Sequence, residues 1–363
     1  MRVKLEDVCE RGSSNLKQSD VIDKTGEYPI YGAAGCLGNV DFYHQEKPYV
    51  AVVKDGAGIG RTTLHPPKSS VISTMQYLLP KENVLPEYLC YVVRFMHLEK
   101  YFTGATIPHI YFKDYKNEEF NLETLGRQIE IVGILKRVEN IIEFRRKELQ
   151  QLDNLIKARF VEQFGTLENP VQNFRRATLK ELCSKITDGK HGGCTQEEGT
   201  KRYFVGAREI YDDEVHYDTA PEINVDEFEK DYKRCNIEIG DFLIVNTGAT
   251  IGKSAIATDA RTVHTLLQKS VALLKVKQEL LNPVFLKWCY RVNTTMYMVE
   301  SASAQPNLLL SKINATEIYV PDIGMQEQFA AFVHQVDKSK VAVQKALDEV
   351  QLLFDSLMQE YFG

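Results

Sequence analysis

The sequence of 363 residues has no long apolar run and no paired cysteine motif. Its apolar segments are all much shorter than the roughly 20 residues that a membrane-spanning helix needs. The N-terminal segment MRVKLEDVCERG has no apolar stretch of the kind found in secretion signals. The seven cysteines are dispersed and include no C-x-x-C pair, so they predict free thiols and no zinc site. We therefore expect a cytoplasmic protein that does not contact a membrane.

Motifs for catalysis are also lacking. The eight histidines form no H-x-x-H or H-E-x-x-H pair, and no Ser, Cys or Asp lies in a nucleophile-elbow context. The segment NPVF (282–285) differs from the N-P-P-[FY] motif of amino-methyltransferases, and Asn282 is better interpreted as a helix N-cap before Pro283. The formal net charge of −6 argues against a lone nucleic-acid binder, although a local basic face or a partner can supply positive charge. The chain is expected to be non-catalytic, with no cofactor or metal of its own.

The sequence does contain an internal duplication. Six segments of the first half recur in the same order in the second half, with an offset of 174 residues at the first pair (3 and 177) and 198 at the last (152 and 350). The pairs are VKLEDVC and ATLKELC, GAGIGR and GATIGK, LPEYLCYVVRF and NPVFLKWCYRV, GATIPHI and ASAQPNL, LGRQIEIVGILKRVE and MQEQFAAFVHQVD, and LDNLIKARFVEQFG and VQLLFDSLMQEYFG. Each half is therefore predicted to be one copy of the same structural unit.

Two glycine-rich segments, GAGIGR (56–61) and GATIGK (248–253), follow short apolar runs. The first is not G-x-G-x-x-G, because Arg61 stands in place of the third glycine. The second is not a P-loop, because Thr247 occupies the position of a required glycine and Gly248 comes one residue late. Two interpretations stay open: a tight turn between two strands, or a turn that brings backbone amides and one cation, Arg61 or Lys253, to a phosphate.

The pattern predicts an α/β protein with four segments: globules at 1–122 and 166–322, and long helices at 123–165 and 323–363. The segments YVAVV, QYLLP, DFLIVNT and SVALLKV are typical of strands, and the segments 85–102 and 282–299 are typical of helices opened by proline. Residues 125–163 and 325–361 contain no proline, and their apolar residues alternate by four and three as in a coiled coil. The predicted seams are Ile142, Leu149, Leu152 and Ile156, and Val343, Leu347, Val350, Phe354, Leu357 and Tyr361. The helices are expected to pair with each other, and their length would then set the separation of the globules.

Polar loop residues of the types that contact DNA occur in both halves. Gln and Asn can pair bidentately with adenine, and Arg and Lys with guanine, although such residues are common in the loops of any protein. The candidates in the first half are Tyr31, Lys54, Arg61, Thr106 and His109. Those in the second half are Lys190, His191, Lys201, Arg202, Arg208, Asn246, Thr247, Lys253, Gln305 and Asn307.

The sequence resembles the specificity subunit of type I restriction–modification systems over essentially its whole length. The features that carry the resemblance are YPIYGAAG, TDGKHGG, DFLIVNTGATIGK, AQPNLLLSKI and two long helices ending in FVEQFG and MQEYFG. The resemblance implies two target recognition globules, one for each half of a bipartite site in double-stranded DNA. It also implies two antiparallel helices that give the chain pseudo-twofold symmetry.

Partners are implied by the same resemblance. Two modification subunits carrying S-adenosylmethionine would methylate adenine, and a restriction and motor subunit would join them. The helix residues expected at the subunit-docking surface are Leu149, Leu152, Ile156, Leu347, Val350 and Phe354. Two alternatives stay open: a coiled-coil scaffold that binds protein without DNA specificity, and an enzyme that binds a nucleotide at the glycine-rich segments.

Overall fold

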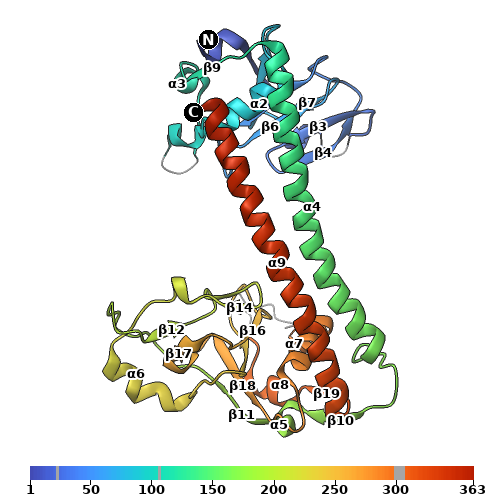
Figure 1. The fold of residues 1–363 in the computed structure, drawn as a ribbon, viewed down its shortest axis with the longest axis vertical. Coiled ribbons are helices and arrows are strands. Elements are labelled where there is room, and N and C mark those ends of the chain that lie inside the picture. The colour runs from blue at the N-terminus through green and yellow to red at the C-terminus, as the bar shows by residue number, and fades with distance from the viewer. Residues whose placement is uncertain (22–23, 105–107, 298–306) are drawn as a thin grey trace. The chain divides into compact units, whose positions relative to one another are not determined.

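The computed structural model describes residues 1–21, 24–104, 108–297 and 307–363, and it divides into two compact units (Figure 1). Unit 1 contains Met1–Lys147 and Gln344–Gly363, and unit 2 contains Glu148–Val343. Each unit therefore combines an α/β globule with a part of each long helix. The four segments predicted from the sequence separate the globules from the long helices, whereas each of the two units includes both. The four-segment division stays a prediction.

Unit 1 is built on a four-stranded antiparallel sheet in the order β2-β8-β5-β6. Its strands are β2 (Cys9–Ser13), β8 (Met75–Pro80), β5 (Tyr49–Val53) and β6 (Thr62–His65). The other strands are β4 (Gly35–Val40), β3 (Tyr28–Gly32) and β7 (Ser70–Val71), which form a second sheet, and the pair β1 (Arg2–Lys4) and β9 (Glu119–Asn121). The helices are α1 (Leu5–Val8), α2 (Pro86–Phe95), α3 (Phe112–Tyr115), the first part of α4 (Leu125–Phe164) and the last part of α9 (Ile323–Phe362).

Unit 2 repeats this arrangement with a sheet in the order β11-β18-β15-β16. Its strands are β11 (Cys183–Asp188), β18 (Val271–Val276), β15 (Phe242–Val245) and β16 (Ser254–Ile256). The remaining strands form the pairs β12 (Tyr203–Val205) with β17 (Thr265–Leu267), β10 (Arg175–Thr178) with β19 (Glu317–Val320), and β13 (Ile210–Tyr211) with β14 (Glu214–Val215). The helices are α5 (Leu179–Leu182), α6 (Val225–Asp231), α7 (Pro283–Val292), α8 (Leu310–Ala315) and the remaining parts of α4 and α9.

The predicted duplication is confirmed by the register of the strands. Val53 lies opposite Met75 in unit 1, and Val245 lies opposite Val271 in unit 2. The structure also shows that YPIYG (28–32) and RYFVG (202–206) are equivalent, which sequence comparison missed. The first segment pairs in parallel through β3 with β7, and the second pairs in parallel through β12 with β17. The side chains of these two segments have little in common, so only the backbone pairing reveals their equivalence.

The predicted strands and the predicted N-cap are confirmed, whereas two helices are shorter than expected. Asn282 accepts hydrogen bonds through Oδ1 from the amide of Val284 at 2.8 Å and from that of Phe285 at 3.4 Å. Helix α2 ends at Phe95, because His97 adopts the left-handed conformation with φ of 50°. Helix α7 ends at Val292. The apolar periodicity continues beyond both ends, so it did not indicate where the backbone leaves the helix.

The two long helices are confirmed, and α4 and α9 are 40 residues each. Within unit 2 they run antiparallel, because Asp153 pairs with Lys340 at 2.8 Å and Phe160 meets Phe329 edge to face with ring centroids 5.3 Å apart. The same helices enter the core of unit 1, where Phe362 contacts Tyr88 with ring centroids 5.3 Å apart. Of the predicted seam, Ile142, Ile156 and Leu347 are buried and the others are half-buried. The helices are thus part of both globular cores as well as partners of each other.

All seven cysteines are free, as predicted. None of the helices among the described residues has both the length and the apolar character that crossing a membrane requires.

Candidate functional site

In each unit the glycine-rich segment forms a tight turn between two antiparallel strands. In unit 1 this first glycine turn (56–61) joins β5 to β6, and the amide of Gly60 donates to the carbonyl oxygen of Val53 at 2.9 Å. In unit 2 the second glycine turn (248–253) joins β15 to β16, and the amide of Gly252 donates to Val245 at 3.1 Å. The amide of the following cation also donates back into the turn in both units. These amides serve the turn itself, which supports the structural interpretation over a phosphate cradle.

Close packing explains why glycine stands at the fifth position of both turns. Gly60 has φ of +80°, and a Cβ there would lie 2.7 Å from the backbone nitrogen of Glu99. Gly252 has φ of +92°, and a Cβ there would lie 2.4 Å from the ring of Tyr297. Both conditions exclude a side chain, so the glycines that resembled a phosphate motif are required by the fold.

In each unit a segment later in the chain is hydrogen-bonded through its backbone to the glycine turn or to the residues just before it. In unit 1 the amide of Gly56 donates to Pro108 at 3.0 Å, and that of Ile110 donates to Lys54 at 2.9 Å. In unit 2 the amide of Leu308 donates to Asn246 at 2.7 Å. Isolated bridges pair Asp55 with His109 and Thr247 with Asn307. The structure thus brings together candidates that lie more than 50 residues apart in each half of the sequence.

The loop that precedes β8 in unit 1 and β18 in unit 2 is also hydrogen-bonded to the residues just before the glycine turn. The amide of Lys54 donates to the carbonyl oxygen of Thr74 at 3.0 Å, and the amide of Asn246 donates to that of Ser270 at 3.0 Å. We therefore define the unit 1 site and the unit 2 site by five equivalent positions each. The unit 1 site is Lys54, Asp55, Ser73, Thr74 and His109, and the unit 2 site is Asn246, Thr247, Lys269, Ser270 and Asn307.

The unit 1 site is charged. The carboxylate of Asp55 lies 2.7 Å from Nδ1 of His109 and 3.4 Å from Nζ of Lys54. Near it, Arg61 donates to the carbonyl oxygen of Ala33 at 2.9 Å, which links the first glycine turn to the segment YPIYGAAG. The charges at this site are therefore largely used in pairs with each other.

Tyr31, another candidate, lies above a buried histidine. The ring of Tyr31 contacts that of His65 with centroids 4.4 Å apart, and His65 also stacks on Tyr49 at 5.3 Å. Burial lowers the pKa of His65 to about 4, so this imidazole is neutral at pH 7. Burial also raises the pKa of Tyr31. The ring of Tyr31 thus packs on a buried aromatic cluster that carries no charge at pH 7.

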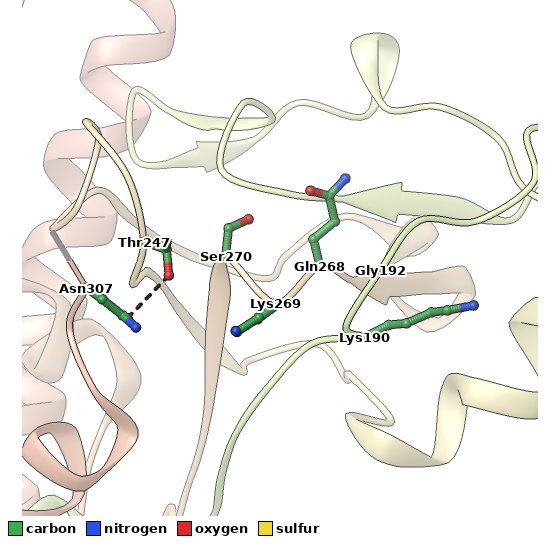
Figure 2. A pocket seen from close by; sticks show the side chains of 7 residues that line it. All are labelled: Lys190, Gly192, Thr247, Gln268, Lys269, Ser270 and Asn307. Atoms are coloured by element: carbon green, nitrogen blue, oxygen red, sulfur yellow. Dashed lines mark hydrogen bonds between the residues drawn. The ribbon is translucent and has the colours of Figure 1, made fainter. Parts of the chain in front are cut away.

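The unit 2 site opens into a pocket of about 390 Å³ lined by Lys190, Gly192, Thr247, Gln268, Lys269, Ser270 and Asn307 (Figure 2). The hydroxyl of Thr247 donates to Oδ1 of Asn307 at 3.3 Å. Asn307 and Lys269 are exposed, and in Figure 2 the Lys269 side chain extends in the direction of that pair. Asn246 is only 4% exposed, so its main contribution is the backbone contacts that hold the site. The unit 2 site therefore presents neutral hydrogen-bonding groups beside one lysine.

Lys190 lines the same pocket but is engaged elsewhere. Its ammonium group lies 2.7 Å from Asp231 and 3.1 Å from Glu227, both on α6. The hydrogen bonds that Lys190 donates to the carboxylates of Asp231 and Glu227 raise the pKa of Lys190. Figure 2 shows its side chain extending away from Asn307, so Lys190 holds α6 against the pocket wall. The neighbouring His191 is exposed and lies 3.4 Å from Asp188.

The other candidates of unit 2 lie at several places. Lys201 and Arg202 precede β12, and the guanidinium of Arg202 stacks on Phe228 at 5.1 Å. Arg208 is exposed and follows the other end of β12, next to a backbone amide that donates to the Ser270 hydroxyl at 3.2 Å. Lys253 is exposed at the end of the second glycine turn. Arg208 and Lys253 thus lie next to segments of the unit 2 site. Lys201 and Arg202 lie at the opposite end of β12 from Arg208.

Two candidates, Thr106 and Gln305, lie outside the described residues. Conversely, sequence reasoning missed Asp55, Lys269 and the Ser73 position. The short apolar runs of β8 and β18 did indicate the strands that Ser73 and Lys269 precede, but no motif indicated that these loops face the glycine turns. The described part of the chain also has no group of three or more His, Cys, Asp or Glu side chains arranged for a metal ion.

Known structures share this architecture. The S subunit of a type I restriction–modification system from M. genitalium is 15% identical, with a TM-score of 0.56 over 100% of this chain and 96% of that one. A chain described in connection with complex assembly and conformational transition of the type I R-M system is also 15% identical, with a TM-score of 0.57 over 99% of this chain and 97% of that one. At this identity the likeness establishes the fold. No match was found among curated proteins.

The sequence itself matches the family model for the type I restriction modification DNA specificity domain, twice, at residues 1–154 and 172–351. The two matches cover most of the chain and coincide with the two copies of the duplication. This chain therefore belongs to that family, and the resemblance noted from its motifs is confirmed.

Proposed function

We propose that this chain is the DNA recognition subunit of a type I restriction–modification complex, in which each unit reads one half of a bipartite site. The observation that carries the proposal is a backbone arrangement, called the frame below, that is the same in both units but presents different side chains. The same three segments converge in each unit through equivalent backbone hydrogen bonds: the glycine turn with the two residues before it, the segment around His109 or Asn307, and the loop before β8 or β18. The side chains they present are charged in unit 1 and mostly neutral in unit 2, as two different half-sites require.

The chemistry of the sites suits DNA. Exposed cations at the site margins, Arg208 and Lys253, can contact phosphates and fix the position of the unit on the duplex. Thr247, Lys269 and Asn307 offer the hydrogen-bond donors and acceptors that distinguish base edges in the major groove. Because the overall charge is −6, partner subunits would supply part of the phosphate neutralisation.

The long helices would set the number of unread base pairs between the half-sites. In this proposal two modification subunits dock on the helix surface that includes Leu149, Leu152, Val350 and Phe354. The other two residues expected there, Ile156 and Leu347, are buried within this chain and lie beneath that surface. Those subunits would bind S-adenosylmethionine and methylate one adenine in each half-site, and a restriction and motor subunit would complete the complex. The chain itself would catalyse nothing.

The first test is methylation mapping. The chain is co-expressed with the products of its neighbouring genes, any complex is purified through a tag on this chain, and modified adenines are mapped in host DNA. One bipartite motif is the expected result. A chain that purifies alone and gives neither methylation nor DNA binding with any partner would favour the protein-binding scaffold instead. Nucleotide binding by the isolated chain at micromolar concentration would favour the enzyme alternative.

The second test exchanges a globule. Replacement of residues 170–320 by the corresponding segment of another family member should change one half of the methylated motif and leave the other half and the gap unchanged. A matched exchange of residues 1–122 should change only the opposite half. If either exchange alters both halves, the two units do not read independently.

The third test changes the helix length. Four residues, about one helical turn, are inserted after Gln150 in α4 and after the equivalent Asp348 in α9, so that the antiparallel helices keep matching lengths. The unread gap is expected to lengthen while both half-sites stay the same. An unchanged gap in an active complex would contradict the spacer role.

A further inference from the structure

The equivalence of the two sites permits a more specific assignment, which rests on the proposed function. We infer that the pairs Asp55–His109 and Thr247–Asn307 are the corresponding specificity pairs of the two units. We further infer that Lys269 adds guanine recognition in unit 2 which Ser73, its equivalent in unit 1, does not provide. The readout of each half-site would then be concentrated at the same three positions of the repeated frame.

The positions correspond by backbone geometry and not by sequence similarity. The amide of Ser73 donates to the carbonyl oxygen of Leu16 at 2.7 Å, and the amide of Lys269 donates to that of Lys190 at 2.9 Å. The bridge between Asp55 and His109 has its counterpart between Thr247 and Asn307. None of these bonds depends on the side chain, so the positions can vary without loss of the frame.

The side chains at these positions are polar and reachable, and those of unit 2 leave donors unused within the site. Asn307 accepts the Thr247 hydroxyl at Oδ1, which leaves its amide NH₂ group to donate outward. Lys269 is exposed and belongs to no ion pair within the described parts of the chain. A lysine and an amide NH₂ group match the two acceptors, O6 and N7, that guanine presents in the major groove.

The unit 1 pair has a different chemistry at the same positions. Asp55 lies 2.7 Å from Nδ1 of His109 and 3.4 Å from Nζ of Lys54, so the side chains of Asp55 and His109 join the turn to the loop. Ser73 adds only a hydroxyl group next to this cluster. A lysine there would resemble unit 2, so reciprocal exchange of side chains is a direct test of the assignment.

The experiment uses the full complex with its modification subunits and a library of randomised DNA duplexes. Bound sequences are selected for the wild-type complex, for Asp55→Thr/His109→Asn, for Thr247→Asp/Asn307→His and for Lys269→Ser. Each pair exchange should alter one half of the selected motif and leave the other half unchanged. Lys269→Ser should lower discrimination for one guanine by about tenfold to a hundredfold in the unit 2 half only.

Matched controls are Glu119→Thr and Glu317→Thr, which occupy equivalent exposed strand positions of β9 and β19, outside the two sites. They should leave both halves unchanged. Should an exchanged pair prevent assembly of the complex, Asp55→Asn and Thr247→Val keep the size of each side chain and test the same positions.

The outcomes separate the inference from the proposed function. If the wild-type complex selects no bipartite motif, the proposed function fails and the inference with it. If the wild-type motif is clear and the exchanged complexes select the same motif, the inference alone is wrong. A parallel weakening of both halves would also overturn it, whereas a change or loss of specificity confined to one half supports it.

Discussion

Unit 1 and unit 2 differ in their cores as much as in their sites, although their frames coincide. In unit 2 the long helices and α7 bury a cluster of four phenylalanines, Phe160, Phe164, Phe285 and Phe329, with ring centroids 5.0–5.7 Å apart. The residues at the same positions of unit 1 are Met358, Phe362, Tyr88 and Ile131. The frame is therefore maintained by apolar volume and backbone hydrogen bonds rather than by particular side chains.

A second difference concerns an arginine that holds each globule together. In unit 1, Arg94 of α2 pairs with Glu139 of α4 at 2.8 Å. In unit 2 the equivalent Arg291 of α7 pairs with Asp213 of the β13–β14 hairpin at 2.5 Å. The carboxylate equivalent to Glu139 is Asp337, which lies 3.7 Å from Lys340. The arginine thus occupies the same position in both units but pairs with the long helix in unit 1 and with the β13–β14 hairpin in unit 2.

The largest expected effect is in the phenylalanine cluster. Phe160→Ala should destabilise unit 2 by about 3–5 kcal/mol, because it removes a fully buried ring and leaves a cavity. The equivalent Met358→Ala should destabilise unit 1 by about 2–4 kcal/mol, because methionine is smaller and its neighbours can adjust. Native-state hydrogen exchange of the β15 and β5 amides measures each unit separately. Equal losses in both units for either variant would contradict the division into two units.

The glycine turns allow the next comparison. Gly60→Ala should destabilise unit 1 by about 3 kcal/mol, because a positive φ and contact with a backbone nitrogen both oppose a Cβ. Gly252→Ala should cost unit 2 about 2 kcal/mol, because the obstructing Tyr297 ring can move further than a backbone atom.

The control for both variants is Gly56→Ala, at a glycine with φ of +84° and no atom within 4 Å of the added Cβ. Its cost of about 1 kcal/mol isolates the conformational part. Denaturant unfolding compares the three variants. If Gly56→Ala is as harmful as Gly60→Ala, close packing is not the reason for glycine at the fifth position of the turn.

Acid should destabilise unit 1 selectively through His65. Burial lowers its pKa in the folded protein from the ordinary value of 6.5 to about 4. The unfolded chain then binds a proton more readily, so stability is full above about pH 6.5 and falls as the pH decreases towards 4, by roughly 2–3 kcal/mol. The equivalent position of unit 2 is Ala257, which cannot titrate.

His65→Phe is the matched variant for this prediction. It should remove most of the difference in acid sensitivity between the units, because phenylalanine keeps the stacking on Tyr49 without a titrating group. Hydrogen exchange from pH 7 to pH 4 measures the slope for each unit. A slope in unit 1 that the substitution leaves unchanged would assign the acid sensitivity to other groups.

The smallest expected effects concern the arginine pairs. Glu139→Gln should cost unit 1 about 1 kcal/mol, since the pair is partly exposed and screened by solvent. Asp213→Asn should cost unit 2 a similar amount, whereas Asp337→Asn should cost at most a few tenths of a kcal/mol. Thermal unfolding of the three variants gives the ranking. A larger loss for Asp337→Asn than for Asp213→Asn would show that Arg291 pairs with the helix in solution.

Much of the fold could be predicted because it depends on local patterns. The duplication, the strands 49–53 and 242–245, the cap at Asn282 and both long helices follow from short-range periodicity and turn chemistry. The ends of α2 and α7 could not be predicted, because the apolar pattern continues where the backbone changes direction at His97 and Asn293. The equivalence of YPIYG and RYFVG was hidden for the related reason that parallel pairing constrains the backbone and few of the side chains.

The candidate sites were predicted in part. Residue type and turn position indicated Lys54, His109, Thr247 and Asn307, which the structure brings together in pairs. The same reasoning gave Lys190, whose charge is taken up by two carboxylates of α6, and Asn246, whose side chain is buried. Partners that lie 37 or more residues away decide whether a polar side chain is available, and no local motif contains that information.

The sequence by itself determined the repeated unit, its family and its long helices, because hydrophobic periodicity and chain order encode them directly. Only the tertiary structure decided which loops converge, which cations are already paired and why glycine stands at the turns. Those features depend on contacts between segments far apart in the chain, where hydrogen-bond geometry and close packing select among many side chains that look alike in sequence.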